Sequence, residues 1–406
     1  MCPDDHTEGP VIADRVESLL SAGDGILRLE PAWVARDFLP PGRRLGLPED
    51  AYDVGERGAI CERWLGSTTR ADNRVGPDDE GLSLVATDRG ERLTLADAVA
   101  AAPVLLLGQE YAASHPAGLG RLPKIFDYAA RLPFHIHPPQ SYASLVGCSA
   151  KDEAYHFLPG VDLGPHPETF LGVHPSVADG PRGDALLPYL VDWDSDLILR
   201  HSAAQLQVPG EGFHVPSGML HAPGTALTLE LQEDSDVLAM FQALNAGRII
   251  SKDLLFKDVR PADREAHGER FPLGFVDWAG NGDPYLFENR HLTPQPIGPV
   301  PWGREDWVFY DSHKFSGKRV VLRPGERATR VERGVHTLFA WSGSGRWGGK
   351  EIRGGEPGMD ELLVSATAAT RGLQIENTGT EDLMVFLFFG PDINDDVPVI
   401  ERRTAS

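Results

Sequence analysis

The sequence predicts a mainly β protein that contains two β-barrels and a few short helices, and three observations support this fold class. Its 406 residues exceed the size of one ordinary domain, so two or three domains are expected. Glycine (44 residues) and proline (33 residues) are spread along the chain, which indicates many turns between short segments. Short apolar runs with strand-like alternation recur from about residue 120 onwards.

The N-terminal part of the chain predicts one helix and then a loop-rich region. Apolar residues within 11–23 follow helical spacing and end at a glycine. Residues 24–95 contain only short apolar pieces between turn-forming residues. Thr94 is a candidate N-cap of a further helix, because Asp97 follows it by three positions. We expect residues 1–110 to pack on the first barrel and to contribute strands to it.

Two groups of predicted strands correspond to the two barrels. The first barrel is expected within 111–258, with strands at 134–137, 154–158, 212–216 and 226–231. The second is expected within 306–400, with strands at 307–310, 319–322, 337–341, 361–364, 373–376 and 383–389. The intervening residues 259–305 are rich in charge, glycine and proline, which predicts a linker or covering loop.

The composition argues against several classes of partner. A formal charge of −22 would repel nucleic acid, and the longest apolar run, 385–389, is far too short to span a membrane. The N-terminus lacks the pattern of an export signal, and three cysteines (Cys2, Cys61 and Cys148) are too few for a disulfide framework. We therefore expect a cytoplasmic protein with a small-molecule partner, and we leave a homodimer open.

One group of residues has the pattern of a metal site. His135 and His137 flank a single residue on a predicted strand, so both imidazoles lie on the same face, about 7 Å apart. Glu153 opens the next strand, and His221 follows a Pro-Ser-Gly turn at 216–218 that would bring a neighbouring strand alongside. Three imidazoles and one carboxylate suit one divalent metal, with zinc as the first choice and Mn, Fe, Co or Ni as alternatives.

These residues resemble the motifs of the type I mannose-6-phosphate isomerases. Residues 122–138 match, without a gap, a family run that contains K-x-x-D followed by L-S-x-Q-V-H-P. Residues 150–156 resemble G-K-x-E-x-W-Y, and 215–236 resemble V-P-A-G-x-x-H-A with a later E-x-Q-x-x-S-D. Upstream, Glu62, Trp64 and Ser67 resemble E-x-W-x-x-S, so the similarity covers about residues 60–260.

The resemblance implies an enzyme that interconverts aldoses and ketoses. Such an enzyme would have two cupin (jelly-roll) barrels and bind one metal. Residues 111–258 would form the metal-binding cupin domain, with His135, His137, Glu153 and His221 as ligands. The C-terminal cupin domain contains His336 but no His-x-His pair, so we expect it to be metal-free.

The resemblance also implies roles for residues around the metal. Glu230 is the candidate general base that shuttles a proton between adjacent sugar carbons, and Lys151 is a candidate acid/base or substrate-binding lysine. Gln232 shares the strand face of Glu230, and His214 lies on a neighbouring predicted strand, so both are expected to contact substrate.

Three positions depart from the family pattern. His135 stands at the metal-binding glutamine, Pro133 at a serine near the substrate, and Met240 at an arginine implicated in catalysis. Arg200 or Arg248, from nearby turns, are candidates to replace the missing cation and to bind the substrate.

The first functional hypothesis is a metal-dependent isomerase of a sugar or sugar phosphate. A second is another metal-cupin enzyme, an oxygenase or a lyase of a small polar metabolite, because three histidines and a glutamate also support iron or manganese chemistry. A third is a non-catalytic sugar-binding cupin, motivated by the replacements at Pro133 and Met240.

Overall fold

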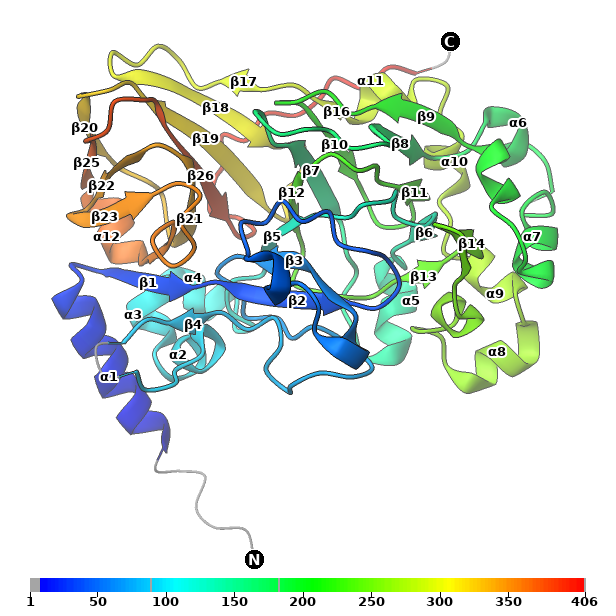
Figure 1. Cartoon of the computed structure of the whole chain (residues 1–406), viewed down its shortest axis with the longest axis horizontal. Coiled ribbons are helices and arrows are strands. Elements are labelled where there is room, and N and C mark those ends of the chain that lie inside the picture. Colours follow the sequence, from blue (N-terminus) through cyan, green and yellow to red (C-terminus); the bar gives the residue numbers. More distant parts are fainter. Residues whose placement is uncertain (1–7, 88–89, 182, 405–406) are drawn as a thin grey trace, which may run out of the picture. The chain divides into compact units, whose positions relative to one another are not determined.

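The computed structural model describes residues 8–87, 90–181 and 183–404, and its chain divides into two compact units (Figure 1). Unit 1 comprises residues within 1–34, 63–124 and 294–398, and unit 2 comprises residues within 35–62, 125–293 and 399–406. Cys2 lies outside the described residues. Among the helices of the described part, none has the length and apolar character that crossing a membrane requires.

Unit 1 contains two antiparallel sheets. The larger has eight strands, in the order β17 (Gln295–Pro296), β18 (Gly303–Phe309), β19 (Ser316–Leu322), β26 (Leu383–Phe389), β21 (His336–Ser342), β24 (Glu361–Val364), β1 (Ile26–Glu30) and β4 (Leu84–Val85). The smaller has four strands, in the order β20 (Arg327–Arg330), β25 (Leu373–Asn377), β22 (Ser344–Trp347) and β23 (Lys350–Arg353).

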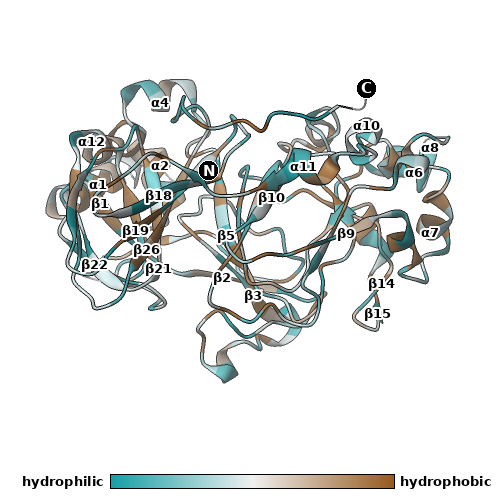
Figure 2. Ribbon diagram, turned by 90° about the horizontal axis from the view of Figure 1, so that it is seen from above, coloured by the Kyte–Doolittle hydropathy of each residue, from teal (hydrophilic) through white to brown (hydrophobic). Residues whose placement is uncertain are grey.

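Apolar side chains of these strands form the core of unit 1. Leu338, Leu362, Val385 and Trp347 are fully buried together, and the ribbon is hydrophobic where β19, β21 and β26 run side by side (Figure 2). The helices of unit 1 are α1 (Glu8–Ala22), α2 (Leu95–Ala101), α3 (Pro103–Leu107), α4 (Gln109–Ser114) and α12 (Ala366–Arg371).

Unit 2 is built around a seven-stranded and a five-stranded antiparallel sheet. The seven-stranded sheet has the order β16 (His291–Leu292), β10 (Gly212–Val215), β7 (Glu153–Phe157), β12 (Thr228–Gln232), β5 (Leu122–Phe126), β3 (Ala59–Trp64) and β2 (Ala32–Arg36), and its last three strands each cross a unit boundary along the chain. The five-stranded sheet has the order β13 (Ala239–Met240), β6 (His135–Ile136), β11 (His221–Ala222), β8 (Glu168–Leu171) and β9 (Ala203–Leu206). A separate hairpin joins β14 (Leu244–Asn245) to β15 (Arg248–Ile249).

Short helices complete unit 2. They are α5 (Gln140–Ala143), α6 (Pro175–Ala178), α7 (Leu187–Asp192), α8 (Pro261–His267), α9 (Arg270–Leu273), α10 (Trp278–Asn281) and α11 (Leu286–Arg290). Single 3-10 turns occur at η1 (Glu49–Ala51), η2 (Gly55–Arg57), η3 (Ser144–Val146), η4 (Leu197–His201) and η5 (Lys252–Leu255).

The predicted fold class, mainly β with short helices, is confirmed by these sheets. The N-terminal helix and the N-cap at Thr94 are also confirmed, because α1 covers most of 11–23 and the Thr94 hydroxyl accepts a hydrogen bond from the Asp97 amide at 3.0 Å. The segment 259–305 contains the short helices α8 to α11, and its role as a linker or covering loop stays a prediction. Pro261 at the start of α8 and the Asp277 cap of α10 favour these short helices locally.

The first 110 residues contribute to both units. β2 and β3 join the seven-stranded sheet, whereas Ile26–Arg28 of β1 pair with Leu362–Val364 of β24 in unit 1. Such a pairing joins segments more than three hundred positions apart, and local patterning does not encode it. The residue limits of a metal-binding and a metal-free cupin domain stay predictions.

Candidate metal centre

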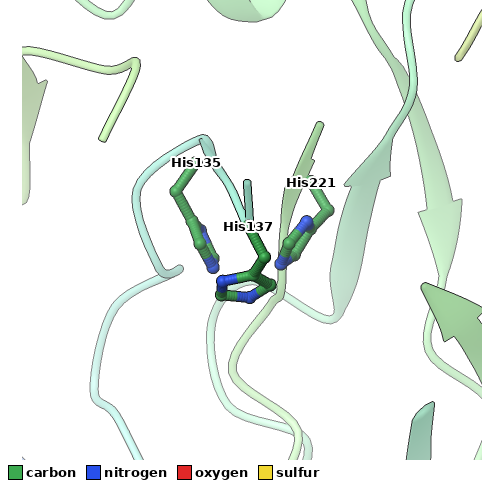
Figure 3. A group of neighbouring side chains, drawn as sticks. All are labelled: His135, His137 and His221. Carbon is green, nitrogen blue, oxygen red and sulfur yellow. The ribbon is translucent and has the colours of Figure 1, made fainter. Parts of the chain in front are cut away.

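Three histidines of unit 2 converge at one point, and we call His135, His137 and His221 the histidine cluster (Figure 3). His135 of β6 pairs directly with His221 of β11, and His137 follows two residues after His135. Strand alternation explains the arrangement, because Ile136, between the two histidines, packs instead in an apolar core that includes Leu220.

The ring nitrogens of the histidine cluster lie close together, and backbone carbonyl oxygens fix the orientation of each ring. One nitrogen from each ring lies within 4.8 Å of the others, and all three residues are buried. The opposite nitrogens, Nδ1, lie 2.7 Å from the carbonyl oxygen of Pro133 for His135, 2.7 Å from that of Val237 for His137, and 2.9 Å from that of Met219 for His221. Since a carbonyl only accepts hydrogen bonds, each Nδ1 must donate one. The Nε2 atom of each ring then faces the cluster, and in a neutral ring this atom carries the lone pair.

The environment favours the neutral form of the His135 and His137 rings. Burial, followed by the nearby His221 and His137, holds the pKa of His135 well below its usual range. Burial, followed by the Lys151 charge, lowers the pKa of His137 to about 4. Neutral imidazoles with converging lone pairs are the form that binds a metal ion.

Glu153 brings a carboxylate from the other sheet of unit 2. It opens β7, is buried, and places Oε2 at 3.0 Å from His137 Nε2 and Oε1 at 3.0 Å from His221 Nε2. A neutral Nε2 and a carboxylate oxygen are both acceptors, so these short separations call for a positive charge between them. Imidazole nitrogens and a carboxylate are donors that suit a divalent cation. The ligand atoms that all lie within 4.8 Å of one another are those of the three histidines, and Glu153 as a fourth ligand stays a prediction.

The charge of Glu153 is maintained despite its burial. Burial alone would raise the pKa of its carboxyl group, but the Lys151 ammonium, the strongest of the opposing influences, holds this pKa well below its usual value. Lys151 Nζ lies 2.8 Å from Glu153 Oε2, and the Tyr155 hydroxyl donates a hydrogen bond to Glu153 Oε1. Glu153 is therefore an anion that is held by named donors on both oxygens.

Lys151 and Glu230, the predicted catalytic pair, lie beside Glu153. Lys151 Nζ is 3.4 Å from Glu230 Oε1, and both side chains are buried. Burial would lower the pKa of Lys151, but Glu153 and then Glu230 raise it above its usual value, so the ammonium form persists. Glu230 stands opposite Tyr155 in the pairing of β12 with β7.

Gln232 and His214 also lie on the sheet that bears Glu153. Gln232 of β12 is opposite Glu153 and fully buried, and its Nε2 donates to the carbonyl oxygens of Glu233 at 2.9 Å and Ser235 at 2.6 Å. Its Oε1 has no hydrogen-bond donor within the described part of the chain. His214 of β10 is buried opposite Ala154.

The structure does not bring the two predicted arginines into this group. Arg200 lies in η4 and Arg248 in β15, and both side chains are exposed. Met240, which the sequence resemblance aligns with the family arginine, is buried among apolar residues that include Ile136 and Leu220. The residue that the sequence reasoning missed is Tyr155, although its position two residues after Glu153 on a strand places both on one face.

Comparison with known proteins identifies the fold. No family model matches the chain, and no curated protein sequence matches it. Among solved structures, the chain is similar to the mannose 6-phosphate isomerase of Bacillus subtilis (16% identity, TM-score 0.59), with 90% of this chain and 99% of that chain covered.

Two further structures show the same likeness. A zinc-bound mannose 6-phosphate isomerase has 12% identity and a TM-score of 0.60, and a variant of the phosphomannose isomerase of Salmonella typhimurium has 12% identity and a TM-score of 0.61. Each comparison covers 90% of this chain and 100% of the other. The predicted resemblance is thus confirmed at the level of structure: this chain has the fold of the mannose-6-phosphate isomerases.

Proposed function

We propose that this protein is a metal-dependent isomerase that interconverts an aldose and a ketose, with a sugar or sugar phosphate as its substrate. The observation that most directly supports the proposal is the geometry of Glu153, whose carboxylate approaches two Nε2 acceptors at 3.0 Å with Lys151 and Glu230 alongside. The fold shared with mannose-6-phosphate isomerases, one of them zinc-bound, supports the same reaction class.

The proposed ligands of the metal are His135, His137, Glu153 and His221, and zinc is the first choice among Zn, Mn, Fe, Co and Ni. A bound divalent ion would polarise the carbonyl group of the sugar as a Lewis acid. The low pKa of His137 and the low pKa of Glu153 keep both groups in their metal-binding forms at neutral pH.

Glu230 and Lys151 are the proposed catalytic residues. The Glu230 carboxylate would remove the proton from the hydroxyl-bearing carbon next to the carbonyl and return it to the carbonyl carbon. The hydroxyl proton would pass to the former carbonyl oxygen, and the carbonyl thereby moves by one position. The Lys151 ammonium, held 3.4 Å from Glu230, would donate a hydrogen bond to the substrate oxygen on which negative charge develops.

Gln232 and His214 are the proposed contacts to the substrate. Both amide hydrogens of Gln232 are used by backbone carbonyls, so its amide cannot rotate without placing Oε1 against those oxygens. The buried Oε1 therefore suits a donor, and a sugar hydroxyl has this chemistry. If the substrate is phosphorylated, Arg200 and Arg248 are the arginines proposed to contact its phosphate.

The test is a panel of aldoses and their phosphates incubated with protein that has been loaded in turn with Zn, Mn, Co, Ni or Fe. Ketose formation should be detected by NMR for at least one sugar, and Glu230→Gln should abolish it while zinc binding is retained. The proposal is rejected if no sugar of the panel is converted with any of the metals.

The second candidate function, an oxygenase or lyase, is favoured by the three-histidine set in place of a glutamine-containing set. Metal analysis of the purified protein separates the two candidates. Tightly held iron together with oxygen consumption would favour the oxygenase, and substrate-induced stabilisation without turnover would favour a sugar-binding protein. The cytoplasmic location and the homodimer stay predictions.

A further inference from the structure

Tyr155 contacts the carboxylate at the centre of the candidate site. Its hydroxyl and Glu153 Oε1 form a hydrogen bond in which the phenol donates, because an ionised carboxylate only accepts. Both residues lie on β7, two positions apart, so they share one face of the strand. Each is only 1% exposed, which excludes bulk water as a competing donor.

The phenol ring is itself held in place. Its centroid lies 5.8 Å from that of Phe126 in an edge-to-face arrangement and 6.3 Å from that of His221. Tyr155 also stands opposite Glu230 in the pairing of β7 with β12. Because the ring packs against fixed neighbours, the position of its hydroxyl is set by the apolar core and not by the carboxylate alone.

The contacts of Glu153 divide evenly between its two oxygens. Oε1 receives the Tyr155 hydroxyl and faces His221 Nε2, whereas Oε2 receives Lys151 Nζ at 2.8 Å and faces His137 Nε2 at 3.0 Å. Two donors on opposite oxygens fix the rotation of the carboxylate about its last bond. Without the phenol, Lys151 would be the one remaining donor to this carboxylate among the residues that the structure describes.

From this geometry, which rests on the proposed function for the metal itself, we infer that Tyr155 is a positioning residue of the metal centre. Its hydroxyl holds the Glu153 carboxylate in one orientation relative to the histidine cluster. Tyr155 is not a proposed ligand itself. It would nevertheless set how many oxygens Glu153 presents to a metal and how they are arranged.

The experiment compares Tyr155→Phe with a matched control, Tyr128→Phe. Tyr128 is also buried in unit 2, and its hydroxyl also donates to a buried glutamate, Glu62 Oε1, at 2.5 Å. Both variants lose one phenol hydroxyl next to a carboxylate, but only Tyr155 touches a proposed ligand. The readouts are the visible spectrum of the cobalt(II)-loaded protein, the zinc dissociation constant by chelator competition, and the Tm of the metal-free protein.

We expect Tyr155→Phe to change the position and intensity of the cobalt bands, which report coordination geometry, and to weaken zinc binding about 10- to 100-fold. Tyr128→Phe should lower the Tm of the metal-free protein by a similar amount. Its cobalt spectrum and zinc affinity should match those of the wild type.

A wild-type cobalt spectrum and zinc affinity in Tyr155→Phe would overturn the inference and leave the hydroxyl a purely structural role. A wild-type protein that binds metal but converts no sugar would refute only the isomerase function. A wild-type protein that binds neither cobalt nor zinc would refute both.

Discussion

Each unit buries a cluster of charged side chains among its strands, and the two clusters differ in how their charges balance. In unit 1, Lys318 Nζ lies 2.9 Å from Glu332 Oε2 and 3.9 Å from Glu305 Oε1, and Arg330 pairs with both glutamates. We call Glu305, Lys318, Arg330 and Glu332 the paired-charge cluster. Beside it, His336 is buried with its Nδ1 at 3.0 Å from the Gly334 carbonyl oxygen.

The paired-charge cluster joins two carboxylates to two cations, whereas in unit 2 the Glu153 carboxylate contacts Lys151 Nζ and also faces two imidazole nitrogens of the histidine cluster. In unit 1, side-chain cations of the protein already pair with both carboxylates. In unit 2, the Glu153 oxygens face His137 Nε2 and His221 Nε2 at 3.0 Å, and a divalent ion is proposed to lie among these atoms. Imidazole nitrogens aimed at a carboxylate, in place of ammonium and guanidinium groups, separate the candidate metal centre of unit 2 from the structural ion-pair network of unit 1.

The largest expected effect is that of Glu153→Gln on zinc binding. The total binding free energy of a four-ligand zinc site is about 10 to 16 kcal/mol, so the loss of one anionic ligand should cost about 4 kcal/mol, or about 1,000-fold in the dissociation constant. Glu332→Gln, the matched change in unit 1, should leave the zinc dissociation constant unchanged. Chelator competition measures both, and the comparison fails if Glu332→Gln is the variant that loses zinc.

A second comparison removes the buried lysine of each unit. Lys151→Met and Lys318→Met each remove one buried cation from beside carboxylates, which should lower the free energy of unfolding of the metal-free protein by about 3 kcal/mol. Relative to the zinc-loaded wild type, Lys151→Met should regain most of this loss at saturating zinc, because the ion supplies positive charge next to Glu153, whereas Lys318→Met should keep its full deficit. Urea unfolding with and without zinc tests this, and equal restoration in the two variants would contradict it.

Acid should destabilise the protein in part through His336. Burial lowers the pKa of this imidazole in the folded state to about 4, although the nearby Glu332 acts in the opposite direction. The unfolded chain therefore binds the proton first as the pH falls below about 6.5, and stability is lost between about pH 6.5 and pH 4. His336 should account for about 2 kcal/mol of the loss between pH 7 and pH 5.

The variant His336→Gln measures this contribution, since glutamine does not titrate. Its free energy of unfolding should fall less steeply between pH 7 and pH 5 than that of the wild type, with or without zinc. His137 also has a pKa of about 4, but zinc should change its contribution because the metal holds the neutral ring. An identical pH dependence in His336→Gln and the wild type would count against the lowered pKa.

The proximity of the three histidines follows from rules that a sequence reveals. A His-x-His pair on a strand must present both rings on one face, and His221 pairs directly with His135 across two strands. The fold class could be predicted for the same reason, because short alternating runs between turns encode strands. Metal binding by these residues stays a prediction.

Other features depend on contacts between distant segments and could not be predicted locally. β1 pairs with β24 near the other end of the chain, and the four helices within 259–305 are each only a few residues long and carry weak periodicity. The partner of a hydroxyl, as with Tyr155 and Glu153, depends on side-chain rotamers that a strand pattern does not specify. Exposure of Arg200 and Arg248 likewise depends on how their turns pack.

The smallest expected effect is that of replacing Arg200 or Arg248. It tests whether exposed residues of unit 2 contribute less to substrate binding than the buried residues around Glu153. Arg200→Ala and Arg248→Ala should each raise the KM for a phosphorylated sugar by no more than about fivefold, because an exposed ion pair contributes at most about 1 kcal/mol. The turnover number should not change, since neither side chain lies among the buried residues around Glu153. Arg346→Ala, an exposed arginine of unit 1, is the matched control and should leave KM unchanged. A far larger increase in either unit 2 variant, on the order of a hundredfold, would mean that a turn of unit 2 closes over the bound sugar and brings its arginine against the phosphate.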